Sequence, residues 1–516
     1  MPYRDLLLAQ CAFRRNLIRL TMTELATPPD AELSRRTARL EKLAQRFGDP
    51  FHLTQFGKTH SANEIKNKYA ALQAGEKTTN SVKVAGRIMA IRNNGMFIVI
   101  LDDTDRLQIF HDLKHLTSER AELLALLDLG DIIGVTGLVR RTPRGEITVD
   151  SAELVVLSKA LVPPPEKFHG LKDTDARLRH REQDLVATPR TRETLRARYR
   201  MISAIRQFLH ERNFLEVETP MLHVIPGGAL ANPFVTHHNK LDMPLYLRVA
   251  PELHLKRLVI GGVAEKLFEI NRCFRNEGLS PRHNPEFTSL ELYQAYVDFT
   301  AMIDLTEAIV YEVAMKLHGV PKVKFADIEL DFTPPWPRKG MVDLIREHAG
   351  LDLYSHPDAA RAREAAETVG VKTEPGVSWG QVVEAVFGEK VEDKLIQPTH
   401  VIDLPKEISP LAKAWPERPK LAQRFETFVN GWEVANAFSE LNDPREQRAR
   451  FLEQVEQKHG PDELPHPIDE EFIQALAFGM PPMGGLGIGL DRLAMLMTDS
   501  PSIREVIAFP TMKPVE

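Results

Sequence analysis

The stretch Leu267–Tyr296, LFEINRCFRNEGLSPRHNPEFTSLELYQAY, constrains the fold of this chain more than any other. Its apolar and polar residues alternate on both sides of a loop rich in Gly, Pro and Asn, a pattern that predicts two paired strands with one polar face. We expect these side chains to converge there: Arg275, Phe287, Glu291 and Tyr293 from the strands, and Glu277, Arg282 and His283 from the loop.

These side chains have the chemistry of a nucleotide site. Guanidinium and imidazole groups bind phosphate oxygens, and an aromatic ring stacks on a base. A carboxylate accepts a hydrogen bond from an exocyclic amine or from an ammonium group. The pattern therefore predicts a nucleotide beside a second, cationic ligand. The competing interpretation is a polar hairpin whose charges are satisfied at the surface.

A second hairpin follows at 423–442, where Asn430-Gly431 is a two-residue turn signal. This turn places Glu426 opposite Ala435 and makes Glu426 and Glu433 diagonal neighbours on one face. Two carboxylates in that position can hold Mg²⁺ between themselves and phosphate oxygens. The alternative is a pair of exposed glutamates without a ligand.

Further along this second hairpin, Asn436, Phe438 and Glu440 have the opposite parity to Glu433. In a regular strand they would face away from it, because side chains alternate between the two faces. If all four belong to one site, the strand needs a bulge near Val434–Ala435 to bring them to the same face.

The segment 479–497, GMPPMGGLGIGLDRLAMLM, predicts a glycine-rich strand that leads into a helix with Asp491 and Arg492 in its first turn. The glycines resemble a dinucleotide fingerprint, but the βαβ unit and the later acidic residue of that fingerprint are missing. We therefore interpret the segment as a strand whose glycines let an adenine or a ribose lie against the backbone. Arg492 would stack on the base or hold a phosphate.

Five short strand-like runs between Ser81 and Leu157 predict a small Greek-key barrel of the oligonucleotide-binding kind. Arg92, Phe97 and Gln108 would lie on its binding face, where Phe97 can stack on a base and Gln108 can read a base edge. Before the barrel, residues 29–50 predict a helix with a basic stripe, which is either a solvated face or a contact with phosphate backbone. The stripe consists of Arg35, Arg36, Arg39, Lys42 and Arg46.

A chain of 516 residues implies more than one domain. We divide this α+β chain into an N-terminal extension (1–28), N-terminal helices (29–72), the barrel (73–162), a linker (163–176) and a second domain (177–516). The net charge of -6 argues against bulk binding to nucleic acid, and two cysteines fit a reducing compartment. No apolar run approaches the ~20 residues of a membrane span.

Several segments resemble the class II aminoacyl-tRNA synthetases. The predicted strand FLEVETPML is similar to their motif 1, FRNEG with RHNPEF to motif 2, and GLGIGLDR to motif 3, in the same order and spacing. VAPELHLKRLVIGG, PFVTHHNKLD, KFHGLKD, ANAFSELNDPREQRARF and FPTMKP narrow the resemblance to the bacterial lysyl-tRNA synthetases. It implies an anticodon-binding barrel of the OB type and a catalytic domain with an antiparallel sheet flanked by helices. It also implies a cytoplasmic homodimer that pairs through motif 1.

The resemblance implies an activity as well. ATP, with Mg²⁺, and L-lysine would give lysyl-adenylate and pyrophosphate, and lysine would then pass to the 3′ end of tRNA(Lys). The implied catalytic residues are Arg275 and Arg492. The implied ATP residues are Arg275, Glu277, His283, Asn284, Phe287, Glu426 and Arg492; the lysine residues are Gly228, Glu252, Arg275, Glu291, Tyr293, Asn436, Phe438 and Glu440; the metal residues are Glu426 and Glu433; and the anticodon residues are Arg92, Phe97 and Gln108.

Some positions depart from the family pattern. We expect the departures in the catalytic domain to tune the activity, and the one in the barrel to alter the anticodon contacts. They are His254 in place of Tyr, Asn232 and Trp432 in place of Arg, Glu182-Gln183 in place of Tyr-Leu, and a short strand around Met96 without a lysine after Gly95.

Three other functions compete with this one. An aspartyl- or asparaginyl-tRNA synthetase would present cations to the substrate side chain, whereas Glu252 and Glu440 present anions. A paralogue that lysylates something other than tRNA would have no use for the barrel. A non-enzymatic single-strand-binding protein would need neither the Glu426/Glu433 pair nor Arg492.

Overall fold

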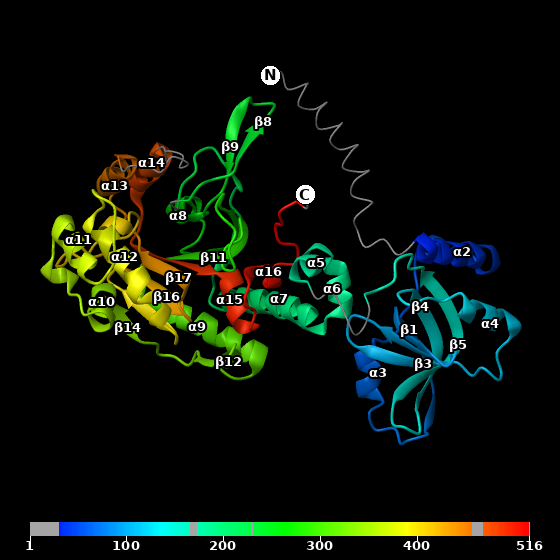
Figure 1. Cartoon of the computed structure of the whole chain (residues 1–516). Coiled ribbons are helices and arrows are strands. Elements are labelled where there is room, and N and C mark those ends of the chain that lie inside the picture. The colour runs from blue at the N-terminus through cyan, green and yellow to red at the C-terminus, as the bar shows by residue number, and fades with distance from the viewer. Residues whose placement is uncertain (1–29, 166–172, 229–230, 457–467, 515–516) are drawn as a thin grey trace. The chain divides into compact units, whose positions relative to one another are not determined.

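The computed structural model of the chain describes residues 30–165, 173–228, 231–456 and 468–514. Its contacts divide the chain into two units, Met1–Gly170 and Leu171–Glu516 (Figure 1). The extension predicted at 1–28 and the part of the linker at 166–172 lie outside the described residues. Within the described ranges, no helix combines the length and the apolarity needed to cross a membrane.

The first unit contains helices, one short 3₁₀ turn and five strands. They are α2 (Asp30–Phe47), η1 (Pro50–His52), α3 (Ala62–Lys68), β1 (Lys77–Arg92), β2 (Phe97–Leu101), β3 (Arg106–Phe110), α4 (Ser118–Ala125), β4 (Ile132–Arg141) and β5 (Ile147–Ser158).

The strands of the first unit close into the predicted barrel, in the order β1-β2-β3-β5-β4. Alternate side chains such as Ile88, Ile98, Ile109 and Val135 are buried and fill its interior. The helix α4 between β3 and β4 was not predicted, although Thr117 caps it in the usual way by accepting from the backbone of its first turn.

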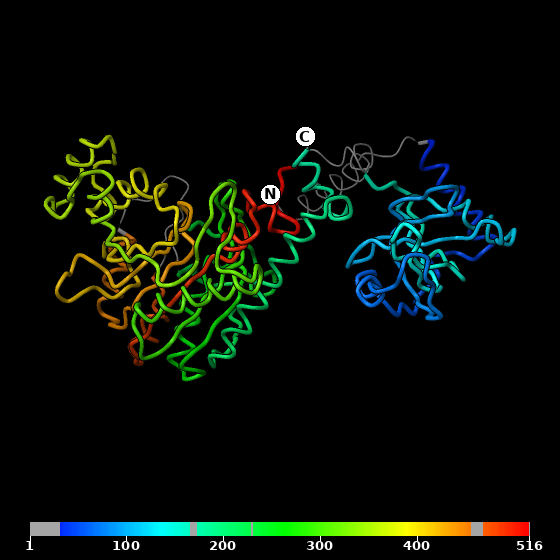
Figure 2. Tube along the Cα trace, turned by 90° about the horizontal axis from the view of Figure 1, so that it is seen from below, coloured from blue at the N-terminus to red at the C-terminus, as the bar shows by residue number. Residues whose placement is uncertain are grey.

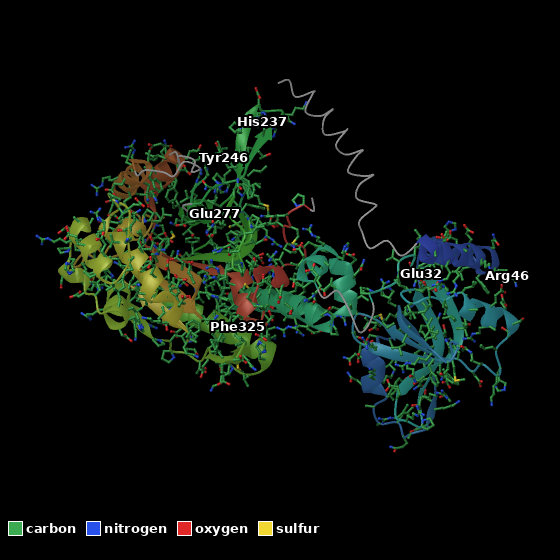
Figure 3. The ribbon with its side chains drawn as sticks, in the orientation of Figure 1. Glu32, Arg46, His237, Tyr246, Glu277 and Phe325 are labelled. Atoms are coloured by element: carbon green, nitrogen blue, oxygen red, sulfur yellow. The ribbon has the colours of Figure 1, made fainter. Side chains whose placement is uncertain are left out.

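The basic stripe of α2 is largely an internal contact. Arg36 is buried and donates to two main-chain carbonyls, and Arg35 and Arg39 both bond the carboxylate of Asp128. Arg46, labelled in Figure 3, bonds a carboxylate of α4. The solvated-face interpretation is therefore wrong for Arg36, which is buried, whereas Arg35 and Arg39 remain partly exposed while their guanidinium groups fasten α2 to the barrel.

The second unit is built on a large sheet. Its strands are β6 (Leu215–Glu216), β7 (Leu222–His223), β8 (Val235–His238), β9 (Met243–Leu247), β10 (Lys266–Phe274), β11 (Glu286–Ala295), β12 (Lys322–Phe325), β13 (Ile328–Asp331), β14 (Arg338–Gly340), β15 (Thr399–Ile402), β16 (Arg424–Val429), β17 (Trp432–Ser439) and β18 (Met483–Gly489).

Helices surround this sheet. They are α5 (Thr174–Arg179), α6 (Arg181–Ala187), α7 (Pro189–His210), α8 (Glu252–Ile260), α9 (Phe299–His318), α10 (Met341–Ala349), α11 (Ala359–Thr368), α12 (Trp379–Lys390), α13 (Pro444–Glu456), α14 (Glu470–Gly479), α15 (Leu490–Met497) and α16 (Ile503–Val506), with 3₁₀ turns η2 (Leu353–Ser355), η3 (Glu392–Lys394) and η4 (Lys406–Ile408).

The order of the large sheet is β14-β15-β16-β17-β18-β11-β10-β6. Its central strands pair antiparallel, as predicted, whereas the edge strands β14 and β6 pair in parallel with their neighbours. The segment FLEVETPML was expected to form one longer strand, but only Leu215–Glu216 pairs with the large sheet, and Leu222 pairs separately with Leu247 of β9. Pairing ends early because Pro220 has no N–H and the side chain of Thr219 turns to the Glu269 carboxylate instead.

The two faces of the sheet have different roles. Phe268, Leu290, Leu486 and Phe425 pack on one face against α7, α9 and α15. The opposite face is covered at one end by α8 and α14, which pack around Leu267 and other apolar residues. Figure 2 shows the C-terminal segment, in red, beside the helices that begin this unit. Polar side chains collect on the second face, where it is not covered by helix.

Candidate active site

The β10–β11 hairpin has the faces predicted for it. Cys273 lies opposite Phe287, and Glu269 lies opposite Glu291, so the polar residues of both strands share one side. Leu290 and the other apolar residues of alternate parity belong to the core on the reverse side. The strict alternation of a strand thus separates a chemical face from a packing face.

The second hairpin contains the predicted bulge. Its register pairs Thr427 with Ala435 but Phe428 with Glu433, so Val434 is an extra residue on β17. The predicted pairing of Glu426 with Ala435 is wrong, because this extra residue shifts the register and places Asn436 opposite Glu426. The bulge is what brings Glu433 to the same cavity as the side chains beyond it.

The glycines of β18 leave room for side chains from its neighbours. Gly485, Gly487 and Gly489 alternate with residues of the apolar core. A Cβ atom added at Gly485 would lie 2.0 Å from Oε1 of Glu440 and 2.6 Å from the ring of Tyr293. Only glycine therefore fits at this position, because a methyl group would occupy the place of the carboxylate.

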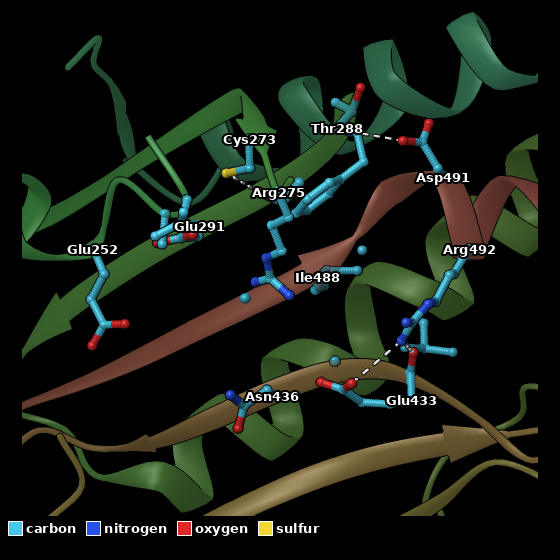
Figure 4. A pocket seen from close by; sticks show the side chains of 18 of the residues that line it. Glu252, Cys273, Arg275, Thr288, Glu291, Glu433, Asn436, Ile488, Asp491 and Arg492 are labelled. Carbon is cyan, nitrogen blue, oxygen red and sulfur yellow. Dashed lines mark hydrogen bonds and ion pairs between the residues drawn. The ribbon is translucent and has the colours of Figure 1, made fainter. Parts of the chain in front are cut away.

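These elements enclose a cavity of about 290 Å³ between β11, β17 and β18 (Figure 4). A neighbouring cavity of about 450 Å³ shares part of its lining and adds Glu426. The structure thereby brings together the predicted ATP, metal and lysine residues of the second unit: Gly228, Glu252, Arg275, Glu277, His283, Asn284, Phe287, Glu291, Tyr293, Glu426, Glu433, Asn436, Phe438, Glu440 and Arg492.

One end of the cavity gathers cations around an aromatic ring. The guanidinium of Arg275 lies 5.1 Å from the ring centroid of Phe287, and its Nε is buried without a hydrogen-bond partner. Arg492 donates to the main-chain carbonyl of Glu433 at 2.6 Å and lies 3.1 Å from Nε2 of His283. Burial, assisted by the charge of Arg492, lowers the pKa of His283, which favours the neutral imidazole.

Glu426 and Glu433 border this end. Glu426 accepts from Arg424 at 2.6 Å, and Glu433 pairs with Arg492 at 3.3 Å. Burial raises the pKa of Glu426 to about 7, against the opposing charge of Arg424. Among the described residues, no group of three or more His, Cys, Asp and Glu side chains is placed to hold a metal ion. The two carboxylates fit Mg²⁺ only as a shared site, in which phosphate and water complete the octahedron.

The other end of the cavity gathers anions. Glu252 on α8 and Glu440 after β17 are both buried, and the ammonium group of Lys256 lies between them. The backbone of Gly228 lies close to Glu252. Its φ is 89°, and a Cβ atom added there would lie 3.3 Å from the Cβ of Glu252. Sequence analysis missed Lys256, although its position four residues after Glu252 on a predicted helix was a usable signal.

Glu291 and Tyr293 lie between the two ends. Burial and the charge of Glu252 raise the pKa of Glu291 to about 8. Burial also raises the pKa of Tyr293, which keeps its hydroxyl protonated. On the neighbouring strand Glu269 pairs with the buried Arg248 at 2.7 Å, an ion pair that sequence analysis did not predict. The positive charge of Arg248 opposes the rise in the pKa of Glu291.

A third set of contacts that sequence analysis did not predict fixes the start of α15. Asp491 accepts from the backbone of Thr288 at 2.7 Å and from Arg198 of α7 at 2.7 Å. All three are buried. This contact ties α15 to β11, and it therefore sets the position of the neighbouring Arg492 relative to the cavity.

The barrel has its own candidate site. Arg92 pairs with Phe97 across β1 and β2, and Gln108 lies on the same outer face of the next strand. Phe110, which was not predicted, faces Phe97 with ring centroids 5.3 Å apart, and Arg140 lies 4.0 Å above the Phe110 ring. The signal for Phe110 was its parity with Gln108 on a predicted strand.

Comparison with known proteins identifies the family. Residues 173–513 match the family described as tRNA synthetases class II (D, K and N), and residues 82–157 match the OB-fold nucleic acid binding domain. A lysine–tRNA ligase of Pelotomaculum thermopropionicum is 51% identical over 485 residues, which are 93% of this chain and 94% of that protein. Lysine–tRNA ligases of Rhizobium meliloti (48% identical; 93% and 96%) and Moorella thermoacetica (50% identical; 94% and 99%) are similar over comparable lengths.

The chain belongs to the class II lysine–tRNA ligases. The residues expected to depart from the family pattern have local structural partners. The ring of His254 lies 4.5 Å from that of His223, and Trp432 packs edge-to-face on Phe325. The carbonyl of Asn232 accepts from the backbone at the start of the motif 2 loop. None of these three departures lines the cavity described above.

Proposed function

We propose that this chain is a lysine–tRNA ligase that forms lysyl-adenylate and pyrophosphate from L-lysine and ATP and then passes lysine to the 3′ end of tRNA(Lys). One observation carries the proposal: two buried carboxylates, Glu252 and Glu440, lie at one end of a cavity whose other end holds Arg275, Phe287 and Arg492. Anions at a closed end favour an ammonium-bearing side chain, while cations beside an aromatic ring favour a nucleotide.

In this proposal the nucleotide occupies the cationic end. Phe287 stacks on adenine, whose amino group donates to Glu277. Arg275 contacts the α-phosphate and the carboxylate of lysine, and its buried, unpartnered Nε supports such a role because an orphaned donor is costly without a ligand. The remaining phosphate contacts come from His283, Asn284 and Arg492.

Glu426 and Glu433 are proposed to hold Mg²⁺ together with phosphate oxygens, and the ion supplies neutralisation of phosphate charge when bound. The chain's own arginines contribute to the same neutralisation. Arg424 and Arg492 keep the two carboxylates in place through contacts at 2.6 Å and 3.3 Å. The support for this assignment is the donor set, two carboxylates beside a phosphate-binding end.

Lysine occupies the acidic end in this proposal. Its ε-ammonium group contacts Glu252 and Glu440, and its α-amino group contacts Glu291 and the backbone near Gly228. The wall beside its alkyl chain is formed by Tyr293, Asn436 and Phe438.

The proposed chemistry needs no protein nucleophile. The lysine carboxylate attacks the α-phosphorus of ATP in line, and pyrophosphate leaves. Arg275 touches both reacting groups, so it aligns them and stabilises the charge that develops on the α-phosphate. In the second step the 3′-hydroxyl of the terminal ribose of tRNA attacks the carbonyl of the adenylate, and AMP leaves.

The barrel face with Arg92, Phe97 and Gln108 is proposed to bind the anticodon, since stacking and base-edge contacts suit an exposed single strand. We further propose a cytoplasmic homodimer that pairs through motif 1. Exposed apolar side chains near this segment support that surface, with Leu215, Met221 and Leu222 each between 45% and 48% exposed.

The barrel also disfavours a paralogue that lysylates something other than tRNA, because it retains an aromatic and polar outer face. The aspartyl and asparaginyl alternatives conflict with the acidic end of the cavity, where a carboxylate or amide side chain would meet two buried glutamates.

ATP–pyrophosphate exchange with each of the twenty amino acids tests the proposal. We expect exchange with lysine, and exchange slower by about 100-fold or more with every other amino acid, because an uncharged isostere leaves buried carboxylates unpaired. Exchange that does not depend on lysine, or no exchange at all, contradicts the proposed function.

A further inference from the structure

Lys256 occupies the centre of the acidic end. Its Nζ lies 2.6 Å from Oε1 of Glu252 and 2.5 Å from Oε2 of Glu440. Its side chain is 1% exposed, so these contacts are shielded from bulk solvent. Three aromatic rings surround the ammonium group, with centroids 5.5–6.0 Å away; they belong to Tyr293, Phe438 and Phe472.

The two carboxylates would be an unfavourable pair without this cation. Burial raises the pKa of Glu440 to about 8; the charge of Lys256 opposes that rise, and the charge of Glu252 adds to it. The same contacts act on Lys256, whose pKa burial would lower but the two carboxylates raise. The ammonium group therefore favours the ionised form of Glu440, against burial and the charge of Glu252.

Simple charge counting defines what the pocket can accept. When both glutamates are ionised, two carboxylates and one ammonium group leave one negative charge. Lys256 contacts one oxygen of each glutamate, so each glutamate keeps a second oxygen. Both carboxylate oxygens of Glu440 are buried without a hydrogen bond, Oε2 being in ion-pair contact with Lys256, and this residue lines the cavity. The arrangement suits a single ammonium group that brings one positive charge and several donors.

We propose that Lys256 is a positioning residue that sets the charge specificity of the lysine pocket. It holds Glu252 and Glu440 side by side as carboxylates and leaves one uncompensated negative charge for the ε-ammonium group of the substrate. The inference deepens the proposed function and rests on it, because it assigns a residue that contacts no reacting atom to the selection of lysine.

The first test is Lys256→Met, which keeps most of the side-chain length and removes the charge. We expect the KM for lysine in pyrophosphate exchange to rise by about tenfold or more at pH 7, while the KM for ATP and kcat change by less than about threefold. We also expect the acid rise of the lysine KM to begin at least about one pH unit higher than in the unaltered protein.

The sign of the pH shift follows from Glu440. Without Lys256 its pKa is higher, so the carboxylate is lost earlier as the pH falls. The other groups facing the pair are the same in both proteins: Glu291 and Tyr293 from β11, whereas Gly485 of β18 and Phe472 of α14 add no charge. A role in packing alone would raise the lysine KM equally at every pH.

The second test is chemical rescue of Lys256→Ala. This substitution removes the equivalent of n-propylamine, so n-propylammonium added to the assay should restore the lysine KM by about tenfold. The matched neutral additive is 1-propanol, which fills the same space without charge. Equal rescue by the two additives would overturn the proposal, because it would assign only packing to Lys256.

A variant that does not fold is handled by removing one carboxylate as well. Lys256→Met combined with Glu440→Gln leaves one buried negative charge, on Glu252, instead of the two left by Lys256→Met alone, and we expect it to show no acid shift relative to Glu440→Gln alone. If it shows the same shift, Lys256 acts through some other group and the proposal is wrong. Exchange by the unaltered protein separates the two hypotheses. If this exchange does not depend on lysine, the proposed function is wrong. If it does, but the unaltered protein and Lys256→Met have parallel pH profiles, only the role of Lys256 is wrong.

Discussion

Two pairs of glutamates line the same site, and they differ in burial and in partner. Glu252 and Glu440 are buried and share one lysine of the chain. Glu426 and Glu433 are partly exposed, and each contacts a separate arginine. The residue type is identical, so its surroundings decide which cation it selects.

The buried pair is shielded from bulk water. It therefore favours binding of an ammonium group, whose N–H groups donate hydrogen bonds to the carboxylates. The open pair borders a cavity that admits phosphate oxygens and water, which suits a hard ion that keeps part of its hydration. The predictions below test this division, beginning with the residue between the two pairs and ending with a residue of the barrel.

Arg275→Ala should have the largest effect. This guanidinium is proposed to touch both lysine and ATP, so its loss should lower kcat/KM for pyrophosphate exchange by about 10³-fold or more, with both substrates affected. Arg272→Ala is the matched control, because Arg272 lies on the same hairpin, opposite Thr288, and forms a loose pair with Glu286 at 3.8 Å. A fall in kcat/KM for only one of the two substrates would show that Arg275 does not contact both lysine and ATP.

Glu440→Gln should affect the binding of lysine and spare the binding of ATP. Removing one buried charge leaves Lys256 with a single counter-ion and weakens the lysine site, so the lysine KM should rise by about 100-fold. The ATP KM should stay within about threefold. Glu471→Gln serves as control, since Glu471 is 75% exposed and contacts only Arg257 at 3.4 Å. Steady-state kinetics of pyrophosphate exchange measure both KM values. An equal rise in the KM for lysine and the KM for ATP would refute separate roles for the two glutamate pairs.

Glu433→Gln should give the reverse pattern. We expect exchange to fall by about tenfold at low Mg²⁺ and to recover as Mg²⁺ is increased, because one of two protein ligands is weakened rather than removed. The lysine KM should not change. Titration of activity against Mg²⁺ measures this, and a loss that no Mg²⁺ concentration restores would point to a contact with Arg492 instead.

Phe97→Ala should have the smallest effect on the site itself. Loss of one stacked base should raise the KM for tRNA in charging by about tenfold and leave pyrophosphate exchange unchanged. Phe51→Ala is a control in the same unit, at a ring that is 53% exposed. If charging and exchange fall together, Phe97 is structural and the anticodon assignment is wrong.

The sequence predicted the chemical residues well where strand alternation governs them. Arg275, Phe287 and Glu291 share a face because β10 and β11 are regular, and the turn at Asn430-Gly431 fixed the first pairs of the second hairpin. The bulge was predicted from a parity conflict, which is a local signal. The cross-strand partner of Glu426 was predicted wrongly, because a bulge changes every pairing beyond it.

Contacts between distant segments were the part that local patterns did not contain. A lysine four residues after Glu252 has the spacing of an ordinary helix-surface pair, and only the approach of Glu440 makes Lys256 a buried bridge. The arginines of α2 likewise looked like a solvent or phosphate-binding stripe until Asp128 supplied a partner from the barrel. Propensity does not encode such tertiary partners.

The extra residue Val434 also bears on which changes in chain length β17 tolerates. Removing a residue from a regular strand exchanges the two faces beyond that point. Removing Val434 would instead leave Glu433 and Asn436 two positions apart, on one face, and still opposite Phe428 and Glu426. A deletion at this bulge preserves the frame of the site, whereas the same deletion at Ala437 would turn Phe438 and Glu440 away from the cavity.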